Sequence, residues 1–152
     1  MRALRIFLNL CLAVSCALVA LGHSGAAAAR DQTGKPAVCT DFLAQLKKKP
    51  AHVTFDNCSS APERQGKPLR AIYHVSGVYA ARAEAALIKS VGLNKLKRSC
   101  CQWDSPAASY KSARGQQFVI SMVSEESVVT KRSRWREIPR FEIAVELLTE
   151  EI

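Results

Sequence analysis

Few residues in this sequence have the chemistry of an acid–base or metal site, and two histidines with one aspartate are the most suggestive. His52 and Asp56 share the polar side of an alternating segment, and His74 lies on the polar side of the next one. If the two segments pair as strands, the three side chains meet on the open side of a sheet. Such a group could serve as an acid–base pair or hold a metal ion, but solvent-facing histidines are the commoner arrangement.

Other catalytic patterns are missing from the sequence. A cysteine or serine nucleophile needs a base within reach and a third group that orients the base. The sequence has no phosphate-binding glycine loop, metalloprotease helix or paired-carboxylate motif. We therefore assign no catalytic residue, no metal ligand and no cofactor, and we expect a protein that is not an enzyme. A small envelope hydrolase or metal-binding enzyme using His52, His74 and Asp56 is the alternative.

A second chemical feature is the basic segment around a tryptophan at residues 131–136. Its members are Lys131, Arg132, Arg134, Trp135 and Arg136. An aromatic ring among cations suits an anionic partner, because the guanidinium groups pair with anions while the ring stacks. We predict that this segment binds an acidic protein or an anionic envelope polymer, and not nucleic acid. In the alternative, Trp135 packs on the core and the charges stay solvated.

The first 29 residues have the pattern of a cleavable signal peptide. Arg2 and Arg5 precede an apolar run over residues 6–21, and four alanines at residues 26–29 provide small side chains for cleavage. A transmembrane anchor is the alternative, but the apolar run is short for a span of about 20 residues. Lipid attachment at Cys16 is another. We therefore predict export to the periplasm without a stable membrane anchor.

The overall charge of the chain is basic. The formal net charge is +9, and removal of residues 1–29 takes away two of the 22 basic residues and none of the 13 acidic ones, which leaves +7. Such an excess suits an anionic partner in the envelope, such as a lipid headgroup, a cell-wall carboxylate or an acidic protein. In the alternative, the excess of positive charge serves only to keep the domain soluble.

The mature chain keeps four cysteines, Cys39, Cys58, Cys100 and Cys101. An even number in an oxidising compartment predicts two disulfides. Neighbouring cysteines are poorly placed for a mutual bridge, so we expect Cys100 and Cys101 to pair with Cys39 and Cys58. Each bridge is worth about 2–4 kcal/mol. No C-x-x-C spacing is present, which argues against a zinc site or a redox enzyme.

The elements that position these residues follow from hydrophobic periodicity. Thr40 is the expected N-cap of a first helix that Pro50 ends, and residues 80–91 have the apolar stripe of the main helix. Strands are expected at 51–58, 69–75, around 100–103, 118–122 and 141–147. The order α-β-β-α-β-β-β predicts an α+β domain: an antiparallel sheet of four to five strands with two helices on one face.

Residues 30–38 contain glycine and proline among polar side chains and are expected to form a flexible leader. The remaining residues, 39–152, suffice for one domain with a single core. The predicted organisation is therefore a signal peptide, a leader and one α+β domain.

Five stretches together resemble an uncharacterised bacterial family of small exported proteins, a domain of unknown function. They are CTDFL at 39–43, RQGKPLRA at 64–71, VGL at 91–93, CCQW at 100–103 and FEI at 141–143. The vicinal cysteines before a tryptophan are the most specific of them. The resemblance implies an exported compact domain and transfers no catalytic residue.

The leading functional hypothesis is a non-enzymatic periplasmic binding domain, with inhibition of a toxin or an envelope hydrolase as its specific case. Small exported domains of this build look like periplasmic immunity proteins, although fold alone does not give function. Besides the histidine enzyme, the other alternative is an envelope structural factor that binds an anionic cell-wall polymer through its net charge. The partner and the oligomeric state do not follow from the sequence.

Overall fold

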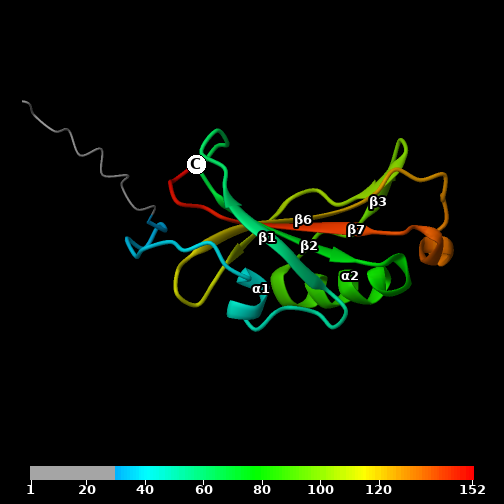
Figure 1. Ribbon diagram of the computed structural model, residues 1–152, viewed down its shortest axis with the longest axis horizontal. Helices are drawn as coiled ribbons and strands as arrows, with labels where there is room; N and C mark the ends of the chain where they lie inside the picture. Colours follow the sequence, from blue (N-terminus) through cyan, green and yellow to red (C-terminus); the bar gives the residue numbers. More distant parts are fainter. Residues whose placement is uncertain (1–29) are drawn as a thin grey trace, which may run out of the picture.

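The computed structural model describes residues 30–152 (Figure 1). The predicted signal peptide and Cys16 lie outside the described residues. Within the described part, no helix is both long and apolar enough to cross a membrane. The elements are α1 (Phe42–Gln45), β1 (Thr54–Ser60), β2 (Leu69–Val75), α2 (Gly77–Val91), β3 (Lys97–Ser99), β4 (Gln102–Asp104), β5 (Ala108–Lys111), β6 (Gln117–Ser124), the 3-10 helix η1 (Arg132–Glu137) and β7 (Phe141–Leu147).

All seven strands belong to one antiparallel sheet with the order β1-β2-β7-β6-β4-β3, and β5 pairs with β6 beside this path. The last strand, β7, lies in the middle and pairs along its whole length with both neighbours. Phe141 is opposite Val75 on one side and Ser124 on the other. The α+β class is confirmed, and the sheet has seven strands instead of the predicted four to five.

Alternation along the central strands separates a core side from an open side of the sheet. The residues of β7 that face the core are Phe141, Ile143, Val145 and Leu147, and each is at most 2% exposed. Side chains from α1 and α2 complete the same hydrophobic core. Figure 1 shows both helices on one side of the sheet. The core therefore lies between the helices and the sheet, and the opposite side carries the polar residues of the strands.

A buried tyrosine fixes the short helix α1 on this core. The hydroxyl oxygen of Tyr73 on β2 accepts a hydrogen bond from the backbone N–H of Leu43 at 3.0 Å. Burial raises the pKa of Tyr73, so the hydroxyl stays protonated at ordinary pH. The N-cap of α1 is Asp41, whose carboxylate accepts from the Ala44 N–H at 3.0 Å, and not the predicted Thr40.

The region around the vicinal cysteines differs from the prediction. One strand was expected there, but β3 and β4 form a hairpin in which Ser99 is opposite Gln102. Cys100 and Cys101 therefore occupy the turn, with Cys100 at φ +47°. This turn has no glycine or asparagine, the usual residues at positive φ, so its sequence carries no hairpin signal. Strand β5 was also missed.

The prediction of two disulfides is wrong for the described chain. Cys39 and Cys58 bond to each other, and the thiols of Cys100 (exposed) and Cys101 (partly exposed) are free. The sheet order explains this result, because Cys58 lies in β1 at one edge and the other pair follows β3 at the opposite edge. No bridge can span the width of the sheet.

Residues 30–38, predicted as a leader, lie against the domain. A backbone bridge joins Arg30 to Pro36. The Asp31 carboxylate, 4% exposed, accepts a hydrogen bond from the Gln116 side chain at 2.9 Å. Burial tends to raise the pKa of Asp31, but hydrogen bonds from Thr33 and Gln116 outweigh it and lower the pKa below its ordinary value.

The disulfide has a predictable contribution to stability. Replacing Cys39 and Cys58 together with serine opens a loop whose ends are 19 residues apart. The free energy of unfolding should fall by about 3 kcal/mol, because the bridge restricts the unfolded chain. Urea denaturation measures the change. The matched control, Cys100→Ser with Cys101→Ser, should leave stability close to that of the parent, and an equal loss in both double variants would contradict the assignment.

Candidate functional site

Two of the three residues singled out for acid–base chemistry, His52 and His74, line one shallow hollow of about 430 Å³. It is formed where the start of β1 and the end of β2 meet the first turn of α2. We call it the histidine hollow. Its lining includes His52, Thr54, His74, Ser76, Tyr79 and Arg140.

His74 and Asp56 form the closest pair in this area. The Nε2 atom of His74 is 3.3 Å from a carboxylate oxygen of Asp56. A bulge in β1 makes the contact possible, because the register with β2 shifts between Phe55 and Asn57 and leaves Asp56 as the extra residue. The Nδ1 atom of His74 is buried and has no hydrogen-bond partner among the described residues. A carboxylate beside an imidazole orients the ring.

His52 is placed differently from the prediction. It precedes β1, which begins at Thr54, and adopts φ +64° in a turn, so it does not continue the strand alternation. Its ring stacks on Tyr79 of α2, with the ring centroids 3.8 Å apart and the planes at 8°. Among residues 30–152, no group of three His, Cys, Asp or Glu side chains could hold a metal ion. The hollow therefore offers one imidazole–carboxylate pair and one stacked imidazole.

Two members of the basic segment 131–136 pack against the domain: Trp135 is buried, and Arg132 is partly buried beside it. Trp135 on η1 is 2% exposed and packs edge-on against Trp103, with the ring centroids 5.2 Å apart. The guanidinium carbon of Arg132 lies 4.1 Å from the centroid of the Trp135 ring. This stacking is a cation–π contact within the protein. It corresponds to the packed-core alternative for Trp135.

The charge of Arg132 is also used internally. Its guanidinium forms an ion pair with Glu84 of α2, and it donates a hydrogen bond to the Leu96 carbonyl at 2.9 Å. The other carboxylate oxygen of Glu84, which is 4% exposed, accepts from the Leu96 N–H at 2.8 Å. A buried carboxylate is tolerated only with such partners. Glu84 thus joins α2, the segment before β3, and η1.

The remaining cations of η1 are exposed. The Arg134 side chain pairs with Glu137, three residues later, at 2.5 Å. This contact raises the pKa of Arg134 and lowers the pKa of Glu137, with a smaller contribution from the charge of Arg136 to the latter. Lys131 and Arg136 are exposed and take part in no ion pair within residues 30–152. They are the two cations of the segment that stay available to a partner.

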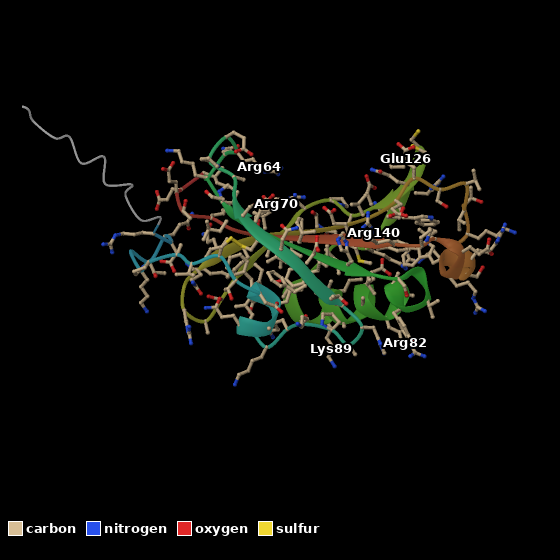
Figure 2. All side chains as sticks on the ribbon, viewed as in Figure 1. Arg64, Arg70, Arg82, Lys89, Glu126 and Arg140 are labelled. Carbon is tan, nitrogen blue, oxygen red and sulfur yellow. A yellow bond between two sulfur atoms is a disulfide. The ribbon has the colours of Figure 1, made fainter. Side chains whose placement is uncertain are left out.

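The outer side of α2 continues this unpaired positive charge. Its exposed positions are Val78, Ala81, Arg82, Ala85, Ala86, Ile88 and Lys89. The only acidic residue of the helix, Glu84, points inward, so Arg82 and Lys89 have no acidic neighbour on their own helix face. Figure 2 shows both side chains on the side of α2 away from the sheet.

The helices α2 and η1 adjoin each other closely. The Gly77 N–H donates to the Ile138 carbonyl at 3.2 Å. A Cβ atom at position 77 would collide with the carbonyl oxygens of Trp135 and Ile138, which explains why glycine starts the helix. We name the exposed cations Arg82, Lys89, Lys131 and Arg136 together the α2–η1 basic face.

The arginines on the open side of the sheet contrast with this face, because they are paired. Arg70 contacts Glu142 and Glu146 at 3.2 Å each, and Arg64 contacts Glu146 at 3.1 Å. In Figure 2, Arg64 and Arg70 lie on the opposite side of the sheet from Arg82 and Lys89. Arg64 and Arg70 are therefore neutralised by acids on the sheet side, whereas Arg82 and Lys89 have no such partner along α2.

Sequence reasoning identified part of this arrangement. It singled out Lys131 and Arg136, but it overlooked Arg82 and Lys89. The signal was present: the helical stripe puts Glu84 on the apolar side, and this leaves residues 77–91 without an outward acid. The internal role of Arg132 has no such signal, because its partner is 48 residues away.

Comparison with known proteins identifies a family without a known function. Residues 29–103 match the family described as a domain of unknown function (DUF4952). This result confirms the resemblance to an uncharacterised family. The match ends at Trp103, so residues 141–143 lie outside it. No curated protein matches the chain. No solved structure matches it either.

Glu84 allows a direct test of the internal ion pair. Glu84→Gln keeps the size of the side chain but removes the charge opposite Arg132, and it should lower the free energy of unfolding by about 3 kcal/mol. Urea denaturation measures the loss. Glu137→Gln is the control, because it breaks the exposed pair with Arg134 and should change stability little. Equal effects of the two variants would show that Glu84 is not the buried partner of Arg132.

Proposed function

We propose that this chain, which matches a family of unknown function over residues 29–103, is a non-enzymatic binding domain for an acidic protein. It is exported to the periplasm through its signal peptide. Its leading specific role is inhibition of a toxin or an envelope hydrolase, in the manner of an immunity protein. The observation that carries the proposal is the outer side of α2, where Arg82 and Lys89 have no acidic neighbour on the helix.

The physical case begins with charge. Unpaired cations on a rigid element attract an acidic surface from a distance and raise the rate of encounter. The α2–η1 basic face supplies four such cations: two on α2, one on η1 and one, Lys131, immediately before η1. The ion pair between Glu84 and Arg132 holds η1 on α2, so the cations are arranged before any partner arrives.

Apolar exposure favours a protein over an anionic polymer. Val78 is 63% exposed and Ile88 is 38% exposed on the same helix as the two cations. Apolar contacts among charges are typical of a protein interface, whereas a polyanion needs the charges alone. The helix has 15 residues and is therefore about 22 Å long, enough for one side of a small interface. Binding to a cell-wall polymer is thus the less favoured form of this proposal.

Charge reversal tests the face. The tagged domain is first used to recover a stoichiometric partner from an oxidised periplasmic extract, and its affinity is then measured at several salt concentrations. Arg82→Glu with Lys89→Glu should weaken binding at least tenfold, about 1.4 kcal/mol, and flatten the salt dependence.

The control makes the same change of charge elsewhere. Lys111→Glu with Arg114→Glu alters two exposed cations around the β5–β6 turn and should reduce affinity far less. Equal losses in the two double variants would mean that only net charge matters, as for a polyanion. Unchanged affinity in Arg82→Glu with Lys89→Glu would exclude the α2 part of the face.

A second function is favoured by one observation, the contact between His74 and Asp56 at 3.3 Å. In this alternative the domain is a small envelope hydrolase in which Asp56 orients His74 as a general base. The hollow beside it has room for a small group. A metal-dependent form of this enzyme has less support, because no group of three His, Cys, Asp or Glu side chains among the described residues could hold a metal ion.

Hydrolysis of p-nitrophenyl acetate and p-nitrophenyl phosphate tests this alternative. If His74 is a general base, the double variant His52→Ala with His74→Ala should lose at least about 100-fold in kcat/KM. The Arg82→Glu and Lys89→Glu variant should keep its activity, which separates the two functions. Equal rates for the parent and the histidine variant would contradict the enzymatic alternative for both ester classes.

A further inference from the structure

The free thiols of Cys100 and Cys101 form a chemical site that neither proposed function uses. They are the free cysteines of the described chain, and they are adjacent in the two-residue turn between β3 and β4. Cys100 is exposed, whereas Cys101 is partly buried. Figure 2 shows Glu126 at the same end of the molecule as this hairpin. The stable bridge between Cys39 and Cys58 lies at the other edge of the sheet.

The two thiols differ in their surroundings. A hydrogen bond with Cys100 raises the pKa of the Cys101 thiol, and the negative charge of Glu126 adds to the effect. Cys101 therefore stays protonated around neutral pH and is a weak nucleophile. Cys100 is the more accessible sulfur. This asymmetry suits a two-step exchange, in which the Cys100 sulfur attacks first and the Cys101 sulfur then resolves the mixed disulfide.

We propose that Cys100 and Cys101 form a redox-active dithiol that exchanges reversibly with a disulfide-containing co-reactant. The Cys100 thiolate attacks one sulfur of the incoming disulfide, its S–S bond breaks, and the first thiol leaves. Cys101 then gives up its proton, and its sulfur attacks the Cys100 sulfur and releases the second thiol. Two electrons and two protons pass from the dithiol to the co-reactant, which becomes two thiols.

The spacing of neighbouring residues makes this exchange reversible. Their Cα atoms are about 3.8 Å apart across a trans peptide, and ordinary disulfides need at least about 4.4 Å. A bridge between neighbours is therefore strained. Strained and exposed disulfides are the easily reduced, regulatory ones. The pair is thus suited to exchange and not to permanent stapling.

Hydrogen bonds also connect the β3–β4 hairpin to residues 127–129. The Cys101 carbonyl accepts a hydrogen bond from the Ser127 N–H at 2.6 Å, and Arg98 donates to the Ser127 carbonyl. The indole N–H of Trp103 donates to the Val129 carbonyl at 2.9 Å. Ring closure at the turn changes the backbone around Cys101, so it should loosen residues 125–131, which lead directly into η1.

The test uses the whole mature protein in buffers with different ratios of reduced to oxidised glutathione. Samples are quenched by alkylation and weighed as intact protein. The parent should lose two alkylatable thiols together, with no glutathione retained, at ratios that leave the bridge between Cys39 and Cys58 intact. Cys101→Ser should stop at one glutathione adduct, because it lacks the resolving thiol. Cys100→Ser should form its adduct more slowly than Cys101→Ser.

Three results would overturn the proposal. The first is a parent protein that keeps both thiols at every ratio tested. The second is a parent that retains glutathione as Cys101→Ser does, since Cys101 would then not resolve the intermediate. The third is a disulfide-linked dimer as the main oxidised product. Hydrogen exchange of residues 125–131 is measured in parallel, and it should be faster in the oxidised parent than in the reduced one.

Discussion

The buried carboxylate of Glu84 is the constraint on which the arrangement of α2, η1 and the β3–β4 hairpin depends. It is 4% exposed and accepts a hydrogen bond from the Leu96 N–H on one oxygen, while the other oxygen pairs with Arg132. A buried charge left without either partner would be strongly unfavourable, so the three segments must meet at this point. The same constraint decides the surface. Because the one acid of α2 is needed inside, Arg82 and Lys89 stay unbalanced outside, and the basic character of that side follows from the packing of the core.

The parts of the fold that could be predicted are those governed by local periodicity. Strands β2 and β7 lie at the predicted residues 69–75 and 141–147, because their apolar residues alternate strictly and this leaves little freedom of register. The main helix was predicted from its apolar stripe, but its start was placed three residues late. Gly77 discourages a helix by propensity, and it is tolerated because its missing side chain admits the backbone of η1. That reason lies in a contact between segments far apart in sequence, which no local pattern reveals.

The disulfide pairing and the division of the basic segment into inward and outward side chains could not be predicted from the sequence, for the same physical reason. An even number of cysteines limits the possible pairings, but the order of strands in the sheet decides which sulfurs meet, and β1 and β3 lie at opposite edges. In the basic segment, Arg132 and Arg134 have the same side chain two positions apart, yet one is stacked on Trp135 and paired with Glu84 while the other points to solvent. The helical period of η1 directs the two arginines to different sides, and the position of α2 places Glu84 beside Arg132 only. Neither feature can be read from the local sequence.

His52 and His74 show what strand alternation can predict and what it cannot. Alternation placed His74 and Asp56 together correctly, and Asp56 is the extra residue of the bulge in β1. It failed for His52, because a residue at φ +64° has left the strand and follows a turn. That turn stacks His52 on Tyr79, which is adjacent in sequence to the exposed Val78 of α2. The histidine hollow therefore borders the first turn of α2, and Arg82 of the α2–η1 basic face follows Tyr79 by three residues on the same helix. An acidic partner that extended from Arg82 across the first turn of α2 would therefore lie over the hollow.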